Sequence, residues 1–197
     1  MKNRFERQLR KKKSIKKFQN FDFDLAKYVK DFYVEEGKAY ISIKIDSIEE
    51  IISDYSIKSY EWLNCDFAAY VEENAYYIPV YYPIVLDIYG CSFNKDEQEM
   101  IKRVIKDYFG LKLGDKVIDL KTNKRKSLTL LGFGLITIII IIFLSSLTEL
   151  YMLFEIMAVV MWFALWEFIE YGWLERKELK KQKTEAGQLA SLTVKFN

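Results

Sequence analysis

The stretch Leu128–Leu147 reads LTLLGFGLITIIIIIFLSSL and holds twenty consecutive residues without a charged side chain. A helix rises about 1.5 Å per residue, so this stretch spans roughly 30 Å, the thickness of the hydrocarbon core of a bilayer. The isoleucines at 138–142 favour a strand in water. In lipid, however, the backbone must satisfy its own hydrogen bonds and therefore forms a helix. We predict a first transmembrane helix over residues 128–147.

A second apolar stretch follows the first almost at once and covers residues 150–173. Because only a short turn separates the two stretches, we expect an antiparallel two-helix transmembrane hairpin. Gly132 and Gly134 in the first stretch are small residues, which let a neighbouring helix approach closely. We therefore expect the paired helix to pack closely against the first one near these glycines.

The second stretch carries acidic side chains on the same helix face as a row of tryptophans. At about 100° per residue, Glu155, Trp162 and Trp166 lie close to one line along the helix, and Glu170 lies about 60° from that line. A carboxylate inside a membrane is costly, so such a residue is a functional candidate. We predict that this face packs against another helix or another copy of the chain. Solvation at the membrane interface and an ion or proton path are the alternatives.

Basic residues flank both ends of the predicted hairpin, whereas the connecting turn holds none. The positive-inside rule places such flanks in the cytoplasm. We therefore predict a multi-pass plasma-membrane protein with both termini cytoplasmic. The residues that set this topology are Lys124, Arg125, Lys126, Arg176, Lys177, Lys180 and Lys181.

The formal net charge of +2 hides an uneven distribution of charged residues. Residues 1–20 carry nine basic side chains against one acidic, whereas residues 21–111 carry nine basic against eighteen acidic. We predict that the N-terminal arm lies on an anionic membrane surface, where each basic residue contributes on the order of 1 kcal/mol. A solvated tail is the alternative, and we do not expect nucleic acid as a partner, because the chain is tethered to a membrane. The residues of this arm are Lys2, Arg4, Arg7, Arg10, Lys11, Lys12, Lys13, Lys16 and Lys17.

The acidic middle of the chain predicts a small cytosolic α+β domain, with the approximate element order α-β-α-α-β-α. Alternating apolar residues predict strands at Ala39–Ile45 and Ile84–Tyr89. A third short strand is expected at Val117–Leu120. Capping residues and helical spacing predict helices before Gly37, over 47–55, over 60–74, and over 94–109 with Gly110 as the stop signal.

The chain therefore divides into six predicted parts, each defined by a change in charge or hydropathy. A basic junction separates the domain from the hairpin, and a basic helical tail follows the second span. The parts are the arm 1–20, the domain 21–120, the junction 121–127, the transmembrane helices 128–147 and 150–173, and the tail 174–197.

A cluster of tyrosines is the best candidate for a recognition surface in the domain. Tyr76, Tyr77, Tyr81 and Tyr82 lie within seven residues of one another, beside two prolines. Tyrosines are favoured at protein interfaces because they bury a large area and keep a polar tip. We expect at least two of them to face outward and to contact a partner; core packing and contact with lipid headgroups are the alternatives.

The composition argues against several classes of enzyme. The chain has no histidine, which is the commonest general base and metal ligand, and its two cysteines are too few for a zinc site of four thiolates. We also find no glycine-rich phosphate loop and no nucleophile elbow. We therefore assign no catalytic, cofactor-binding or metal-binding residue, and we expect both thiols to be reduced.

These observations predict an integral membrane protein with a cytosolic domain that senses, scaffolds or regulates a partner at the inner leaflet without being an enzyme. The expected partners are membrane lipid, a protein partner and a second copy of the chain. An oligomeric pore or channel-like membrane effector is the alternative, built from several hairpins. A membrane-bound enzyme that uses carboxylates or a metal is the second alternative.

Overall fold

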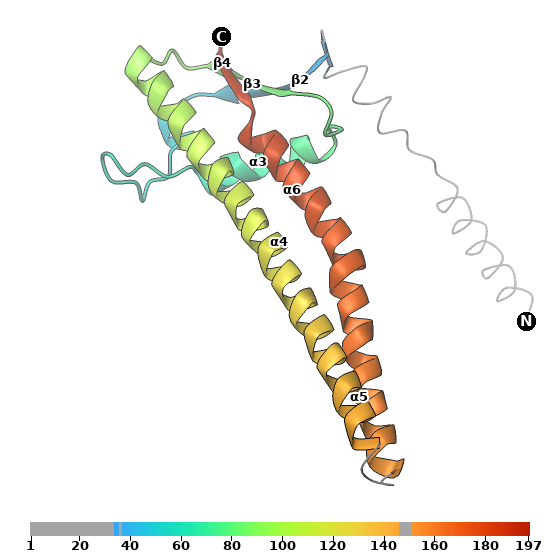
Figure 1. The fold of residues 1–197 in the computed structure, drawn as a ribbon. Coiled ribbons are helices and arrows are strands. Elements are labelled where there is room, and N and C mark those ends of the chain that lie inside the picture. Colours follow the sequence, from blue (N-terminus) through green and yellow to red (C-terminus); the bar gives the residue numbers. More distant parts are fainter. Residues whose placement is uncertain (1–33, 36, 146–150) are drawn as a thin grey trace, which may run out of the picture.

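The computed structural model describes residues 34–35, 37–145 and 151–197, and Figure 1 shows a small α/β domain from which two long helical arms project. The domain holds a sheet with the strand order β1-β2-β3-β4. Strand β1 (Val34–Glu35) pairs antiparallel with β2 (Lys38–Ile45). Strands β3 (Ile84–Gly90) and β4 (Thr193–Phe196) continue the sheet, and β2, β3 and β4 run parallel. The two strands predicted from alternating residues are therefore present, and β4 joins them from the end of the chain.

A crossover connection joins β2 to β3. It contains a 3-10 turn η1 (Ile48–Glu50), a loop and helix α3 (Cys65–Tyr76). The side chain of Asn64 caps α3 by accepting a hydrogen bond from the amide of Asp66 at 2.9 Å. Of the helix predicted over 47–55, only the single 3-10 turn η1 is present. The helix predicted over 60–74 begins five residues later than expected, because its cap is Asn64.

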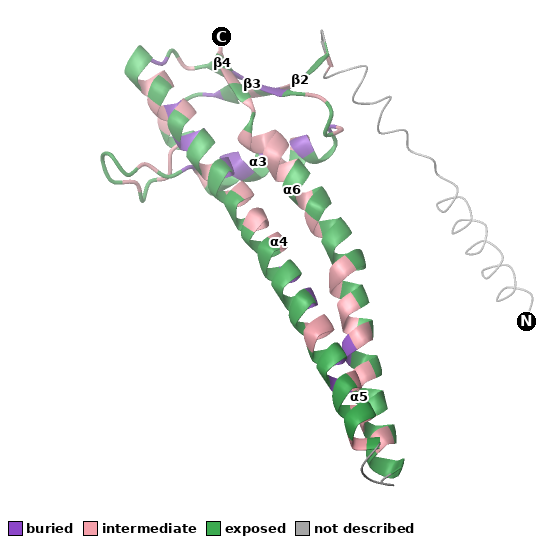
Figure 2. Cartoon of the chain, in the orientation of Figure 1, coloured by how far each residue is buried: buried purple, intermediate pink, exposed green. Residues whose placement is uncertain are grey.

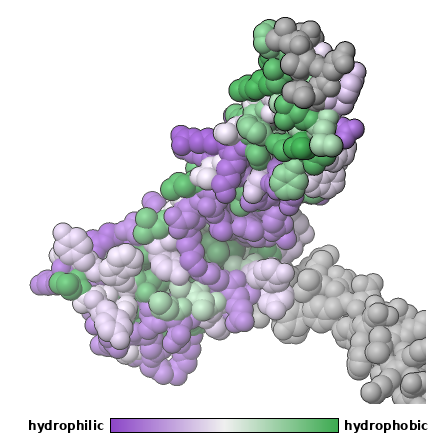
Figure 3. Space-filling view, turned by 90° about the horizontal axis from the view of Figure 1, so that it is seen from below, coloured by the Kyte–Doolittle hydropathy of each residue, from purple (hydrophilic) through white to green (hydrophobic). Residues whose placement is uncertain are grey.

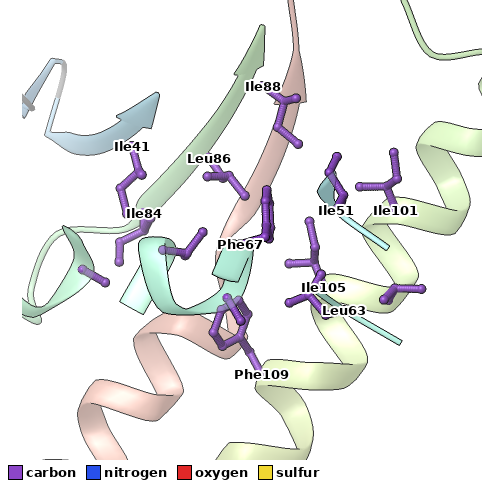
Figure 4. Close-up of a cluster of buried hydrophobic side chains, with 14 of the residues drawn as sticks. Ile41, Ile51, Leu63, Phe67, Ile84, Leu86, Ile88, Ile101, Ile105 and Phe109 are labelled. Atoms are coloured by element: carbon purple, nitrogen blue, oxygen red, sulfur yellow. The ribbon is translucent and has the colours of Figure 1, made fainter. Parts of the chain in front are cut away.

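The hydrophobic core lies between one face of the sheet and the helices (Figure 4). The parallel register places Ile41 beside Leu86 on that face. Helix α4 closes the core with Ile101, Ile105 and Phe109, each at most 1% exposed. Complete burial of a side chain of this size stabilises the folded state by about 2 kcal/mol. The start of α4 is therefore an integral part of the domain.

Helix α4 (Lys95–Ser145) runs for 51 residues from the domain to the far end of the first arm (Figure 1). It begins with a capping box in which the amides of Asn94 and Glu97 each donate to the side chain of the other residue at 2.9 Å. The predicted stop at Gly110 is wrong, and the strand predicted at Val117–Leu120 is helical. A glycine costs a helix interior only about 1 kcal/mol. It ends a helix when its backbone is left-handed, and Gly110 has no positive φ.

The second arm returns the chain to the sheet. It consists of α5 (Tyr151–Ile169), a π-helical turn η2 (Glu170–Glu175) and α6 (Arg176–Ala190), and it leads into β4, which pairs with β3. The predicted fold, an α+β domain followed by an antiparallel transmembrane hairpin, is therefore wrong. The arms are inserted between two neighbouring strands of one sheet. The tail predicted as a helix over 174–197 ends at Ala190, because the alternating residues of β4 fill the sheet edge.

Candidate membrane interface

The distal halves of both arms present mainly apolar surface, as Figure 3 shows. Two helical stretches, Lys95–Ser145 and Tyr151–Ala190, are long and apolar enough to cross a membrane. Exposed residues predominate at this end in Figure 2, and on α4 they include Ile136, Ile139 and Ile142. The side chain of Ile139 is 65% exposed. An exposed apolar surface that extends over the whole end of a helix pair is typical of a segment that lies in lipid.

The arms contact each other in this region through small residues. A Cβ atom at Gly134 would lie 3.2 Å from Cδ2 of Leu165, so a larger residue there would require the leucine side chain to shift, and the glycine permits the close approach. Ala164 on α5 is also buried. Gly132 faces open space, so the structure brings only one of the two predicted glycines to the contact.

The face of α5 that carries Glu155, Trp162 and Trp166 points away from α4, because all three side chains are exposed. Glu170, the first residue of η2, is exposed as well. The structure does not place these predicted contact residues between the two arms. They lie on the outer surface of the second arm, where lipid or another chain has access.

Polar contacts, here called the polar seam, join the two arms at the end of the apolar segments that lies nearest the domain. Asn123 Nδ2 donates to Glu175 Oε2 at 2.8 Å, and Ser127 Oγ donates to the backbone carbonyl of Phe168 at 3.4 Å. Both donor residues are buried. A Cβ atom at Gly172 would lie 3.0 Å from Ser127 Oγ, so the second arm passes α4 as closely as a glycine permits. On the second arm, the polar seam extends from Phe168 to Glu175 and therefore includes the whole π-helical turn η2.

The residues predicted to set the topology surround the arms beside this seam, and all of them are exposed. We call them the basic collar: Lys124, Arg125, Lys126, Arg176, Lys177, Lys180 and Lys181. The ammonium nitrogen of Lys126 lies 5.7 Å from the centre of the Tyr171 ring, within the range of a cation–π contact. The basic N-terminal arm, residues 1–20, and the helix predicted before Gly37 lie outside the described residues.

Between the basic collar and the sheet, α4 and α6 form a stalk. Its two helices contact each other and the domain. Lys116 Nζ donates to Gln182 Oε1 at 3.1 Å, which joins α4 to α6. Lys112 forms an ion pair with Glu72 of α3. Partial burial alone lowers the pKa of Lys112, but its contacts with Glu72 and Tyr108 outweigh that effect and raise the pKa overall. The stalk therefore keeps both of its helices and α3 in one fixed arrangement.

The four predicted tyrosines lie at the end of α3 and in the loop that leads to β3. Tyr76, Tyr77 and Tyr81 are exposed, whereas Tyr82 packs against the core. Partial desolvation of the Tyr81 hydroxyl, with a smaller effect of the neighbouring Tyr82, raises the pKa of Tyr81. Gln188 of α6 donates to the backbone carbonyl of Tyr82 at 2.8 Å. The loop that carries these tyrosines is therefore fastened directly to the second arm.

Sequence reasoning missed a second exposed aromatic group. Residues 53–62, here called the aromatic loop, project from the domain between η1 and α3 (Figure 1). At its turn, Ser59 has a φ of 76°, and its amide donates to Glu61 Oε1 at 2.8 Å. Four large apolar residues within eight positions, with no helical or strand spacing, are the signal that could have revealed the group. They are Tyr55, Ile57, Tyr60 and Trp62, and all are more than half exposed.

The described residues include no group of three Cys, Asp or Glu side chains that could hold a metal ion. Cys65 is exposed, Cys91 is partly buried, and neither forms a disulfide. Comparison of the chain with protein-family models, with curated proteins and with solved structures found no match.

Proposed function

We propose that this chain is an integral membrane protein whose α/β domain stands at the inner leaflet and binds a partner protein without catalysing a reaction. The distal apolar segments would cross the bilayer, and the basic collar would lie at the cytoplasmic headgroups, as the positive-inside rule requires. The observation that carries this proposal is the continuity between arms and sheet: α4 follows β3, and α6 leads directly into β4 beside it.

The stalk holds the domain at a distance from the bilayer. Phe109 is the last α4 residue in the core, and Ser127 lies at the seam. At about 1.5 Å per residue, the helix between them spans roughly 27 Å. A surface at that height meets proteins of the cytoplasm more readily than lipid. The aromatic loop and the exposed tyrosines 76, 77 and 81 are the apolar surfaces available there.

Anchorage is tested by a variant in which residues 117–181 are replaced by a short Gly-Ser linker. Lys116 and Gln182 are hydrogen-bonded, so the linker closes a short gap and leaves β4 in place. We expect this variant to be folded and soluble, and the full chain to stay in the membrane pellet after an alkaline carbonate wash. Release of the full chain by that wash would contradict the proposal.

Partner binding is tested by a photo-crosslinking residue at Tyr60, in the aromatic loop, with Ser42 on β2 as the control position. Both side chains are exposed, but Ser42 is a small polar residue on β2, where Tyr40 and Lys44 are its neighbours on the same face of the strand. We expect a discrete crosslinked product from position 60 in cells and none from position 42. The absence of a product at position 60, or equal products at both positions, would argue against the aromatic loop as the binding surface.

A second candidate, an oligomeric membrane effector, is favoured by the outward face of α5. Glu155, Trp162 and Trp166 are exposed on that face, and a carboxylate facing lipid costs about 3 kcal/mol unless it finds a polar partner or reaches the interface. Contact between copies would cover it. Mass measurement of the full chain in mild detergent tests this candidate. A strict monomer would exclude it, and an oligomer that dissociates on W162A/W166A substitution would support it.

A further inference from the structure

We propose that a groove between the two arms, beside the polar seam, binds the phosphate of an anionic phospholipid headgroup. The proposal rests on the proposed function, because it requires the distal segments to lie in a bilayer. The groove is open to the surroundings and has a volume of about 450 Å³. Helix α4 lines it with Thr122, Arg125, Lys126, Thr129 and Leu130, and the second arm adds Glu167 and Tyr171.

The polar wall of the groove is a single face of α4. Thr122 and Thr129 are seven positions apart, and the adjacent Arg125 and Lys126 each lie three or four positions from both of them. The four side chains therefore project from the same side of the helix. Arginine and lysine are the side chains that bind phosphate oxygens most strongly, through charge-assisted hydrogen bonds. The Thr129 hydroxyl already donates to the backbone carbonyl of Arg125 at 3.0 Å, so it lines the groove without donating to the phosphate.

The second arm fixes one of these cations in position. Tyr171 lies beside Lys126, with the ammonium nitrogen 5.7 Å from the ring centre. This contact keeps the lysine chain against the groove rather than extended into water. Arg125 and Lys126 both line this groove, and Tyr171 contacts one of them, which distinguishes this part of the collar from the basic side chains that lie outside the groove.

Glu167 is the one acidic residue in the lining, and it determines where an anion sits. Ser127 contacts Phe168 and Gly172, so Glu167 lies beyond that level, toward the apolar segments. A phosphate would be repelled from that end and attracted to the end that holds Arg125 and Lys126. The phosphate is thus placed at the height of the collar.

The surface of α4 at the level of Glu167 and beyond it is apolar and suits an acyl chain. Leu130 lines the groove there, and the exposed side chains of Phe133 and Ile136 continue the apolar surface along the same side of α4. A free phosphate has no group for this surface, whereas a phospholipid carries its acyl chains directly below its phosphate. Basic pockets between membrane helices on the cytoplasmic side are known to bind anionic headgroups. The observations therefore favour a lipid over a soluble anion.

The test uses the full chain, reconstituted in vesicles of equal parts phosphatidylcholine and phosphatidylglycerol, then extracted in mild detergent. Native mass spectrometry measures the ratio of retained phosphatidylglycerol to phosphatidylcholine. We expect R125Q/K126Q to lower this ratio about tenfold. The matched control is R176Q/K177Q, which removes the same charge from exposed collar residues outside the groove and should change the ratio by less than about twofold.

Equal losses in the two double variants would show a diffuse charge effect and would overturn the proposal, as would no loss in either. Displacement of the retained lipid by inorganic phosphate would show a phosphate site without lipid selectivity and would also overturn it. The alkaline carbonate wash separates this result from the wider one. If the full chain is washed from the vesicles, the proposed function fails; if it stays and the variants behave alike, only the groove fails.

Discussion

The two ends of helix α4 use the same residue types in opposite ways. Near its start, Ile105 is 1% exposed against the sheet, whereas near its end Ile139 is 65% exposed. The first part is apolar on one face, as expected for a helix that packs on a core in water. The last part is apolar on almost every side, so packing within the chain cannot bury it. One continuous helix thus passes from an aqueous core to a segment that needs an apolar surrounding.

The part of α4 that lies between these two ends belongs to the stalk. Between the two ends, α4 and α6 are held by polar contacts such as the hydrogen bond from Lys116 to Gln182, and the polar seam follows at Asn123 and Ser127. Each contact is worth about 1 kcal/mol or a little more. Together with the partly buried apolar residues Leu113, Val117 and Leu120, these polar contacts hold α4 against α6.

The largest expected effect is a truncation of core side chains at the start of α4. Ile105→Ala should lower the free energy of unfolding of the domain by about 2–5 kcal/mol, because it leaves a cavity in the core. Ile139→Ala, at the other end, should change it by less than about 0.5 kcal/mol. Urea denaturation of the full chain in detergent, followed by the signal of the domain, measures both. Similar losses would contradict the distinction between the ends.

A charged residue at the distal end should impair membrane insertion and leave the stability of the domain unchanged. Ile139→Asp is expected to disfavour membrane insertion by about 3 kcal/mol and to leave the domain folded. Leu111→Asp, an exposed position on the stalk of the same helix, is the control and should insert normally. Glycosylation-site mapping of insertion compares them. An Ile139→Asp protein that inserts as well as the control would show that this segment does not meet lipid.

A smaller effect is expected where the arms meet. Gly172→Ala would bring a methyl group to 3.0 Å from Ser127 Oγ, so either the serine hydroxyl must leave its bond with Phe168 or the two helices must move apart, at about 1–3 kcal/mol. Gly132→Ala, where the added methyl group meets open space, should have almost no effect and serves as the control. Thermal unfolding in detergent would show the difference. Equal melting temperatures would mean that the seam is not tightly packed.

The smallest effect concerns the aromatic loop, which Glu61 ties to the start of α4. Its carboxylate accepts from the Ser59 amide and pairs with Arg103 at 2.9 Å, and the amide contact is the main reason that the pKa of Glu61 is lowered. A lowered pKa in the folded state means a contribution present above the unfolded pKa, about 4.3, and lost as the pH falls through the folded value. The hydrogen-exchange protection factors of the loop amides, which compare the observed exchange rate with the intrinsic rate at each pH, should therefore fall toward acid pH. In the Glu61→Gln variant, the loop amides should lose protection already at neutral pH. If they stay as protected as in the parent protein, the Glu61 carboxylate does not hold the aromatic loop in place.

Much of the fold follows from local patterns, and the rest depends on contacts distant in sequence. Strands β2 and β3 and the capping box before α4 were predicted because alternation and capping act within a few residues. The connectivity was predicted wrongly, because four residues at the chain end, Thr193–Phe196, are too few to signal a strand by themselves. Their pairing with β3 is what turns an appended hairpin into an insertion.

The candidate interface shows the same limit. Composition was sufficient to find both apolar segments and the basic collar, since charge and hydropathy are properties of single residues. Which face of α5 meets α4 depends on how the helices pack, and the tryptophan face turned out to point outward. The groove could not be predicted, because it needs Lys126 and Tyr171, 45 positions apart, to lie side by side.

The most direct test of the account is the sidedness of two single cysteines in intact cells. One protein keeps native Cys65, which is exposed in the domain, with Cys91→Ser; the other carries Tyr151→Cys at the far end of the arms with both native cysteines replaced by serine. A membrane-impermeant maleimide should label position 151 in intact cells and Cys65 only after permeabilisation. Labelling of both positions before permeabilisation, or of neither, would contradict an inserted pair of arms with the domain on the cytoplasmic side.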